Sequence, residues 1–115
     1  MTERVLDIEN WKLEADAVIN DIKDHVKHAF ISQNIQSNNQ RIYINIETLE
    51  GTKFCVELSG NGFRICGKGY DQHNLEEDQY FETPYSLLNK VSPLFCTSFG
   101  NTLLNRLNNL REEID

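Results

Sequence analysis

In the stretch "RIYINIETLEGTKFCVELSGNGFRICGKGY", residues 41–70, apolar side chains recur at every second position. A period of two indicates β-strands that each bury one face. The connections at 50–51 and 59–62 are short and contain glycine, so the strands are predicted to form an antiparallel β-meander over 41–70. The apolar positions are Ile42, Ile44 and Ile46, then Phe54, Val56 and Leu58, then Phe63 and Ile65.

On the N-terminal side of the meander, residues 10–31 carry apolar side chains with a helical period. At about 100° per residue, these side chains fall within an arc of about 120°. The segment is therefore predicted to form one helix over 10–31, with one buried side and one hydrated side. A polar loop, residues 32–40, follows it. The apolar residues are Trp11, Ala15, Val18, Ile19, Ile22, Val26, Ala29 and Phe30.

Two further helices are predicted after the meander. Residues 84–91 follow Thr83 and residues 93–112 follow Ser92, so a hydroxyl side chain stands at each N-cap position. Proline comes next in both cases, at the first helical position. Thr83 and Ser92 also match proline-directed phosphorylation sites, but the capping role explains both.

The order of these elements predicts an α+β fold in a single domain over residues 1–115. It comprises an N-terminal helix, an antiparallel meander of three or four strands and two C-terminal helices. Residues 71–78 are expected to form an acidic loop, and residues 80–82 are the candidate for a short extra strand.

The charge balance excludes several classes of partner. The chain has 18 acidic and 11 basic residues, for a net charge of −7, and such a surface repels phosphate backbones and anionic lipid. We therefore expect no nucleic-acid partner and no membrane partner, and no apolar run approaches the roughly 20 residues of a membrane helix. Cys55, Cys66 and Cys96 are odd in number and not closely spaced, which suits a reducing compartment. The expected location is the cytoplasm, with the nucleus as a second compartment.

Catalytic and metal-binding patterns are weak in this sequence. His25 and His28 have a spacing that can hold zinc on a helix, but no third ligand stands nearby, so a solvated polar face is the simpler interpretation. The glycine-rich segment 60–69 lacks the spacing and the lysine–serine ending of a phosphate loop. We predict no catalytic residue, no metal, no cofactor and no enzymatic activity.

The last helix carries an apolar ladder in "FGNTLLNRLNNL", residues 99–110. Its spacings of four, four and three place the side chains on one side of a helix. The ladder extends beyond what a sheet of roughly 20 Å covers, and Gly100 interrupts the helix at a cost of roughly 1 kcal/mol. Gly100 marks either close packing or the point where the helix leaves the domain. The ladder residues are Phe99, Leu103, Leu107 and Leu110.

Two outcomes are open for this ladder. If it waits for a partner, residues 94–99 should close the core, while Leu103, Leu107 and Leu110 should form an exposed apolar patch beyond Gly100. If it serves only its own domain, the whole ladder should be buried against the strands.

Five blocks of this sequence together resemble the glycogen synthase kinase-3-interacting protein family, in the same order and with similar gaps. The resemblance runs from about Leu13 to Leu110, and a related domain stands at the start of clustered-mitochondria proteins. The blocks are "LEADAVINDI", "YINIET", "YDQ", "ETPYSLLNKVSP" and "FGNTLLNRLNNL".

The resemblance implies a non-enzymatic adaptor that binds glycogen synthase kinase-3. In the family, the last helix docks in a hydrophobic channel on the C-lobe of the kinase, where a helix of the scaffold axin also binds. It implies inhibition of the kinase by competition with axin, and so a role in Wnt signalling. The family pattern of kinase-binding residues maps onto Phe99, Leu103, Leu104, Arg106, Leu107 and Leu110.

The resemblance also implies a second, alternative function. Some members are A-kinase anchoring proteins, whose first helix binds the regulatory subunit of cAMP-dependent protein kinase. Residues 13–31 correspond to that helix, and Ile19 and Asn20 match its pattern, but Lys23 and Asp24 stand where the family has two apolar side chains. Burying these charges unpaired would cost several kcal/mol, which weakens this alternative. A purely structural domain is the third hypothesis.

Overall fold

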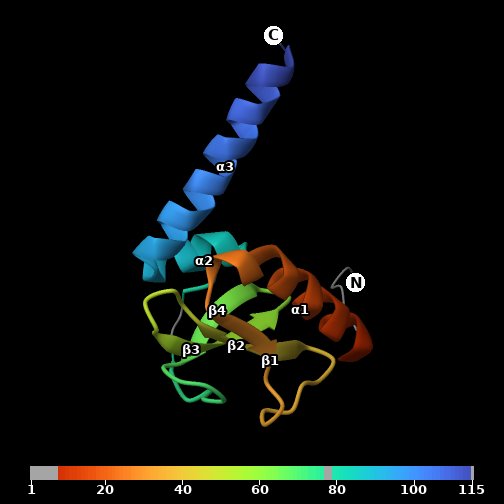
Figure 1. The fold of residues 1–115 in the computed structure, drawn as a ribbon. Helices are drawn as coiled ribbons and strands as arrows, with labels where there is room; N and C mark the ends of the chain where they lie inside the picture. The colour runs from red at the N-terminus through yellow and green to blue at the C-terminus, as the bar shows by residue number, and fades with distance from the viewer. Residues whose placement is uncertain (1–7, 77–78, 115) are drawn as a thin grey trace.

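The computed structural model describes residues 8–76 and 79–114, with side chains as far as Leu104. The predicted α+β fold is confirmed: an N-terminal helix precedes an antiparallel sheet of four strands, and two helices follow it (Figure 1). The elements are α1 (Ile8–Ile22), the 3-10 helix η1 (Lys23–His25), β1 (His28–Ile31), β2 (Arg41–Glu47), β3 (Lys53–Ser59), β4 (Gly62–Gly67), α2 (Pro84–Val91) and α3 (Pro93–Ile114).

The sheet has the strand order β1-β2-β3-β4, and every neighbouring pair is antiparallel. The register places Ile44 opposite Val56, and Val56 opposite Ile65, so the apolar positions of the three long strands share one face. Gly62 provides the tight turn between β3 and β4, with φ +114°, a conformation that favours glycine. The predicted meander over 41–70 is therefore confirmed in type and in direction.

The prediction of one helix over residues 10–31 is wrong in its second half. The α-helix ends at Ile22, and His28–Ile31 form the edge strand β1, paired with β2. A short segment with apolar residues at 29, 30 and 31 satisfies both a helical and a two-residue period. Pairing with β2 decides between them, and it leaves Phe30 41% exposed, whereas a helix would have buried this ring.

The sequence predicts the extra strand at residues 80–82, but the fourth strand of the sheet is β1. Residues 80–82 form only an isolated bridge, in which Phe63 and Phe81 exchange two backbone hydrogen bonds of 2.8 Å. Phe81 therefore covers part of the free edge of β4, while β1 completes the sheet at the other edge.

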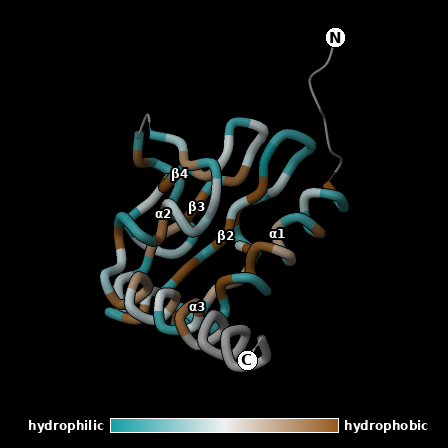
Figure 2. Tube along the Cα trace, turned by 90° about the horizontal axis from the view of Figure 1, so that it is seen from above, coloured by the Kyte–Doolittle hydropathy of each residue, from teal (hydrophilic) through white to brown (hydrophobic). Residues whose placement is uncertain are grey.

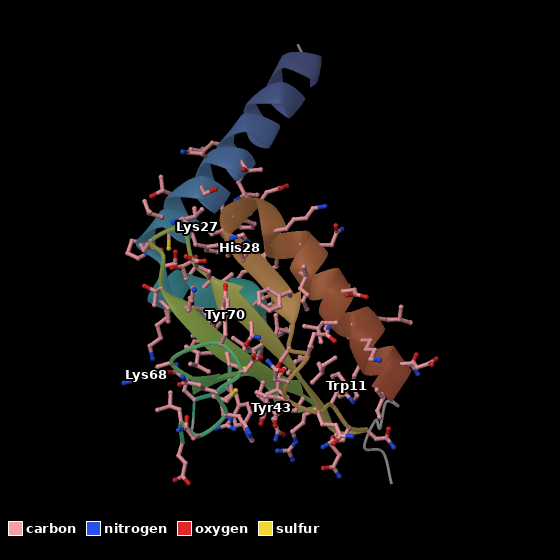
Figure 3. The ribbon with its side chains drawn as sticks, turned by 60° about the horizontal axis from the view of Figure 1, so that its bottom comes forward. Trp11, Lys27, His28, Tyr43, Lys68 and Tyr70 are labelled. Atoms are coloured by element: carbon pink, nitrogen blue, oxygen red, sulfur yellow. The ribbon has the colours of Figure 1, made fainter. Side chains whose placement is uncertain are left out.

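The inner face of the sheet is covered by α1, α2 and the first turns of α3. Hydrophobic and hydrophilic positions alternate along α1, as its colours show (Figure 2). The indole nitrogen of Trp11 donates a hydrogen bond to the carbonyl of Asn39 (2.9 Å), which ties α1 to the loop before β2 (Figure 3). The largest fully buried apolar side chains here are Ile22, Ile42, Ile44, Val56, Leu87, Leu88 and Phe95.

The outer face of the sheet is also covered, which the alternating pattern did not predict. Residues 68–76 fold across it, and a Cβ atom at Gly67 would lie 2.0 Å from the carbonyl oxygen of Gln72. The carboxylate of Asp71 accepts hydrogen bonds from Ser32 (2.6 Å), Asn34 (2.5 Å) and Asn45 (2.7 Å). These three bonds hold the loop against β2 and lower the pKa of Asp71, the bond from Ser32 most.

Candidate functional site

The start of α3 is fixed by its cap and by one carboxylate. The Ser92 hydroxyl oxygen accepts a hydrogen bond from the amide of Phe95 (3.0 Å), as its predicted role as N-cap requires. Glu50, in the β2–β3 connection, accepts hydrogen bonds from the Leu94 amide (2.9 Å) and the Ser92 hydroxyl (2.6 Å). The bond from Leu94, followed by that from Ser92, lowers the pKa of Glu50 to about 2. An ionised side chain thus joins the sheet to the beginning of the helix.

The first two turns of α3 pack against the body through an aromatic cluster. The buried ring of His25 meets Phe95 and Phe99 edge-on, with centroids 5.8 and 5.4 Å away. A hydrogen bond of 2.7 Å joins Nδ1 of His25 to the Ser98 hydroxyl. Tyr85 of α2 lies beside Phe99, with ring centroids 5.1 Å apart. The foot of the ladder, Phe99, is therefore partly buried in its own domain.

Beyond Phe99 the helix leaves the body (Figure 1). Leu103 is 45% exposed and Leu104 is 59% exposed, although both are large apolar side chains. A Cβ atom at Gly100 would meet no atom within 4 Å, so this glycine is not a point of close packing. It marks the place where α3 separates from the domain, the second of the two interpretations given above.

The structure describes the side chains of only some of the six predicted kinase-binding residues. Phe99, Leu103 and Leu104 lie on α3 as expected, and all six positions fall within its backbone bounds. The side chains of Arg106, Leu107 and Leu110 lie outside the described residues. Residues 94–99 close the core through Phe95, which is fully buried, whereas Leu94 is 47% exposed.

The alternative site predicted on residues 13–31 is divided among several elements of the structure. Residues 13–31 do not form one helix, because α1 ends at Ile22 and Lys23 lies in η1. Ile19 is half-buried and packs against the core, while Asn20 is exposed. The three predicted residues therefore do not share one continuous α-helix, and their role in binding a regulatory subunit stays a prediction.

The histidine pair predicted as a weak zinc motif is divided by the fold. His25 is buried against α3, whereas His28 is exposed on β1. Within residues 8–76 and 79–104, no three His, Cys, Asp or Glu side chains come together to hold a metal ion. The described helices include none long and apolar enough to cross a membrane.

A groove of about 710 Å³ lies near the start of α1, at the other end of that helix from α3. Trp11, Leu58 and Phe63 contribute apolar surface to it, and Glu14 and Arg64 contribute charge. None of the predicted site residues lines this groove, so it is separate from the ladder.

Residues that position α3 were missed by sequence reasoning. The local sequence predicts only a turn at Glu50 and a solvated face at His25. Their partners, Ser92 and Ser98, lie 42 and 73 residues away, so no local pattern reveals these contacts. The sequence predicts only one of these features, the Ser92 cap that precedes Pro93.

Comparison with known proteins identifies the family. The GSKIP domain model matches residues 11–110. GSK3B-interacting protein of Mus musculus is 40% identical over 108 residues, 93% of this chain and 78% of the relative. GSK3-beta interaction protein of Danio rerio is 40% identical over 107 residues, 92% and 80% of the two chains. Protein GSKIP homolog of Drosophila melanogaster is 31% identical over 90 residues, 76% of each chain. The chain therefore belongs to the GSKIP domain family.

Proposed function

We propose that this protein is a non-enzymatic adaptor that binds glycogen synthase kinase-3 through α3. One observation carries the proposal: α3 continues beyond the body of the domain and exposes Leu103 of the predicted ladder, with Leu104 beside it. Two relatives are named for interaction with this kinase, and neither of these names describes a reaction.

The exposed ladder suits recognition of a helix by an apolar groove. In this mode a few apolar anchors spaced at one side of a helix provide most of the binding free energy. Burying a leucine contributes about 1.5–3 kcal/mol. The Ser92 cap and the buried Phe95 fix the start of α3 in the domain. Part of the conformational entropy of ordering the helix is therefore lost on folding, before the kinase binds.

The proposed contact residues are Phe99, Leu103, Leu104, Arg106, Leu107 and Leu110. Occupying the axin channel would inhibit phosphorylation of axin-recruited substrates such as β-catenin, without blocking the ATP site. We propose that this inhibition acts in Wnt signalling, and that the protein works in the cytoplasm and the nucleus.

The direct test compares two variants, each with one substitution on α3. Leu103→Glu places a charge on the ladder, and Asn101→Glu places the same charge on the opposite side, also at an exposed residue. In calorimetric titrations with purified kinase, we expect Leu103→Glu to weaken binding at least about tenfold, the loss of one leucine anchor. Asn101→Glu should stay within about twofold. Equal affinities of the two variants would contradict the docking proposal.

Competition is tested separately with a helical peptide from axin. Increasing peptide should displace the protein from the kinase, because both are proposed to occupy one channel. A stable ternary complex would contradict the proposed competition while leaving kinase binding intact.

A further inference from the structure

At Phe99, the first residue of the ladder, the ladder side of α3 faces the body of the domain rather than open solvent. Phe95 and Phe99 contact His25 of η1 and Tyr85 of α2, so this side of the helix points towards the junction of η1 and α2. Leu103 follows Phe99 by four residues and therefore lies on nearly the same side, one turn further out. A partner that covers Leu103 must enter the angle between α3 and this junction.

Exposed charged side chains stand at the end of α1 and in η1, the elements that border this angle. Asp21 ends the exposed side of α1, and Lys23 and Asp24 follow in η1. Asp21 lies beside the hydroxyl of Tyr85: burial and then the Asp21 carboxylate raise the pKa of Tyr85. Since Tyr85 packs on Phe99, Asp21 is held close to the foot of the ladder. Figure 1 shows the end of α1 beside the start of α3.

Asp21, Lys23 and Asp24 together carry one net negative charge, while Lys27 lies at the β2–β3 turn with its Nζ near Gly51. The whole chain is acidic as well, with a net charge of −7. A partner surface that enters the angle meets a negative potential, and basic side chains complement it.

We propose that Asp21 belongs to the charged rim of the kinase-binding surface and faces basic side chains that border the kinase groove. This inference rests on the proposed function. It gives the kinase a second contact, on α1, in addition to the contact with α3. A rim charge acts mainly on the association rate and its salt dependence, whereas the leucine anchors act mainly on dissociation.

The experiment uses a matched pair of charge reversals on α1. Asp21→Lys and Asp16→Lys change the net charge equally, and both residues are exposed. Helical geometry places them about 140° apart, and Asp16 lies more than a turn further from η1. Association with purified kinase is measured by surface plasmon resonance at about 50 and about 300 mM salt. We expect Asp21→Lys to slow association about three- to tenfold at low salt, with the difference shrinking at high salt. Asp16→Lys should change it less than about twofold.

Each other outcome contradicts the inference. Equal effects of the two reversals would mean that only net charge matters, and faster association of Asp21→Lys would mean an acidic partner surface. Asp21→Asn keeps the size of the side chain and should show a smaller decrease of the same sign, which guards against a folding defect in Asp21→Lys. If the unmodified protein fails to bind the kinase, the proposed function fails and this inference with it. Normal binding with identical rates for all variants overturns the inference alone.

Discussion

The carboxylate of Glu50 links the β2–β3 connection to the first turn of α3. It accepts hydrogen bonds from both the Ser92 hydroxyl and the Leu94 amide, at the point where the chain turns from α2 into α3. A carboxylate near a helix N-terminus is favoured by the unpaired amides of the first turn. The ionised form of Glu50 is therefore part of the folded structure.

This residue should make folding sensitive to acid. The pKa of Glu50 is lowered from 4.5 to about 2 by the bonds from Leu94 and Ser92. A group with a depressed folded-state pKa stabilises the fold above its unfolded pKa, and this stabilisation is lost as the pH falls towards the folded value. Urea unfolding should show stability falling between pH 4.5 and 2. Glu50→Gln should show a shallower fall than the wild type.

Two controls make that measurement specific. Asp71 also has a lowered pKa, so part of the acid sensitivity should remain in Glu50→Gln. Glu14→Gln removes one charge from an exposed position of α1 and serves as the matched variant. Equal pH profiles for Glu50→Gln and wild type would show that the contact at the start of α3 contributes no pH-dependent stability.

At the scale of the element, α3 combines two parts. Its first turns, as far as Phe99, pack against the body, and the part beyond Gly100, here called the arm, projects from it. Phe95 is fully buried in the core, whereas Leu103 and Leu104 are exposed. Gly100 lies between these two parts, and its Cβ position is open. Its only evident cost is the low helix propensity of glycine.

Gly100→Ala should therefore strengthen the helix. Alanine is favoured over glycine in a helix interior by about 1 kcal/mol, and no atom within 4 Å opposes the added methyl group. We expect slower hydrogen exchange of the amides around residue 100 and a larger helical signal in circular dichroism. Gly62→Ala is the contrasting variant and should destabilise the fold, because its φ is +114° and its Cβ would lie 2.4 Å from the carbonyl oxygen of Phe81. Faster exchange in Gly100→Ala would contradict this description of α3.

The individual helices and strands differ in how far the sequence predicts them. The strands β2, β3 and β4 and the caps Thr83 and Ser92 follow from local patterns, and the structure confirms them. The strand β1 does not, because residues 28–31 fit two periods and only pairing with β2 decides. The exposure of Leu103 was predictable from the length of the ladder and from Gly100, but the packing of Phe99 against His25 was not, because it depends on a contact between distant segments.

At the scale of the whole molecule, most of the proposed contact residues lie outside the folded core, although Phe99 belongs to both. The core lies between the inner face of the sheet, α1, α2 and the first turns of α3. The outer half of α3 projects away from these elements (Figure 1). Damage to that half should therefore leave the body folded.

Leu107→Pro tests this separation. Proline in a helix interior costs about 3 kcal/mol or more, and the substitution also removes a ladder residue. We expect loss of kinase binding by calorimetry, together with an unchanged near-ultraviolet spectrum from Trp11 and the buried aromatic rings. Thermal unfolding of the body should keep its midpoint within a few degrees. Collapse of the near-ultraviolet signal would show that the arm is needed for the fold.

The projecting half of α3 has a consequence for how this sequence changes through evolution. Residues of the body must satisfy neighbours in the core, so substitutions there are constrained by folding whatever the protein binds. Beyond Gly100 the helix leaves those neighbours, and an exposed helical position tolerates most residues without loss of stability. Natural selection on the arm would then act through its partner alone. A lineage that lost the partner should keep the sheet and α1 while its ladder drifts towards polar residues.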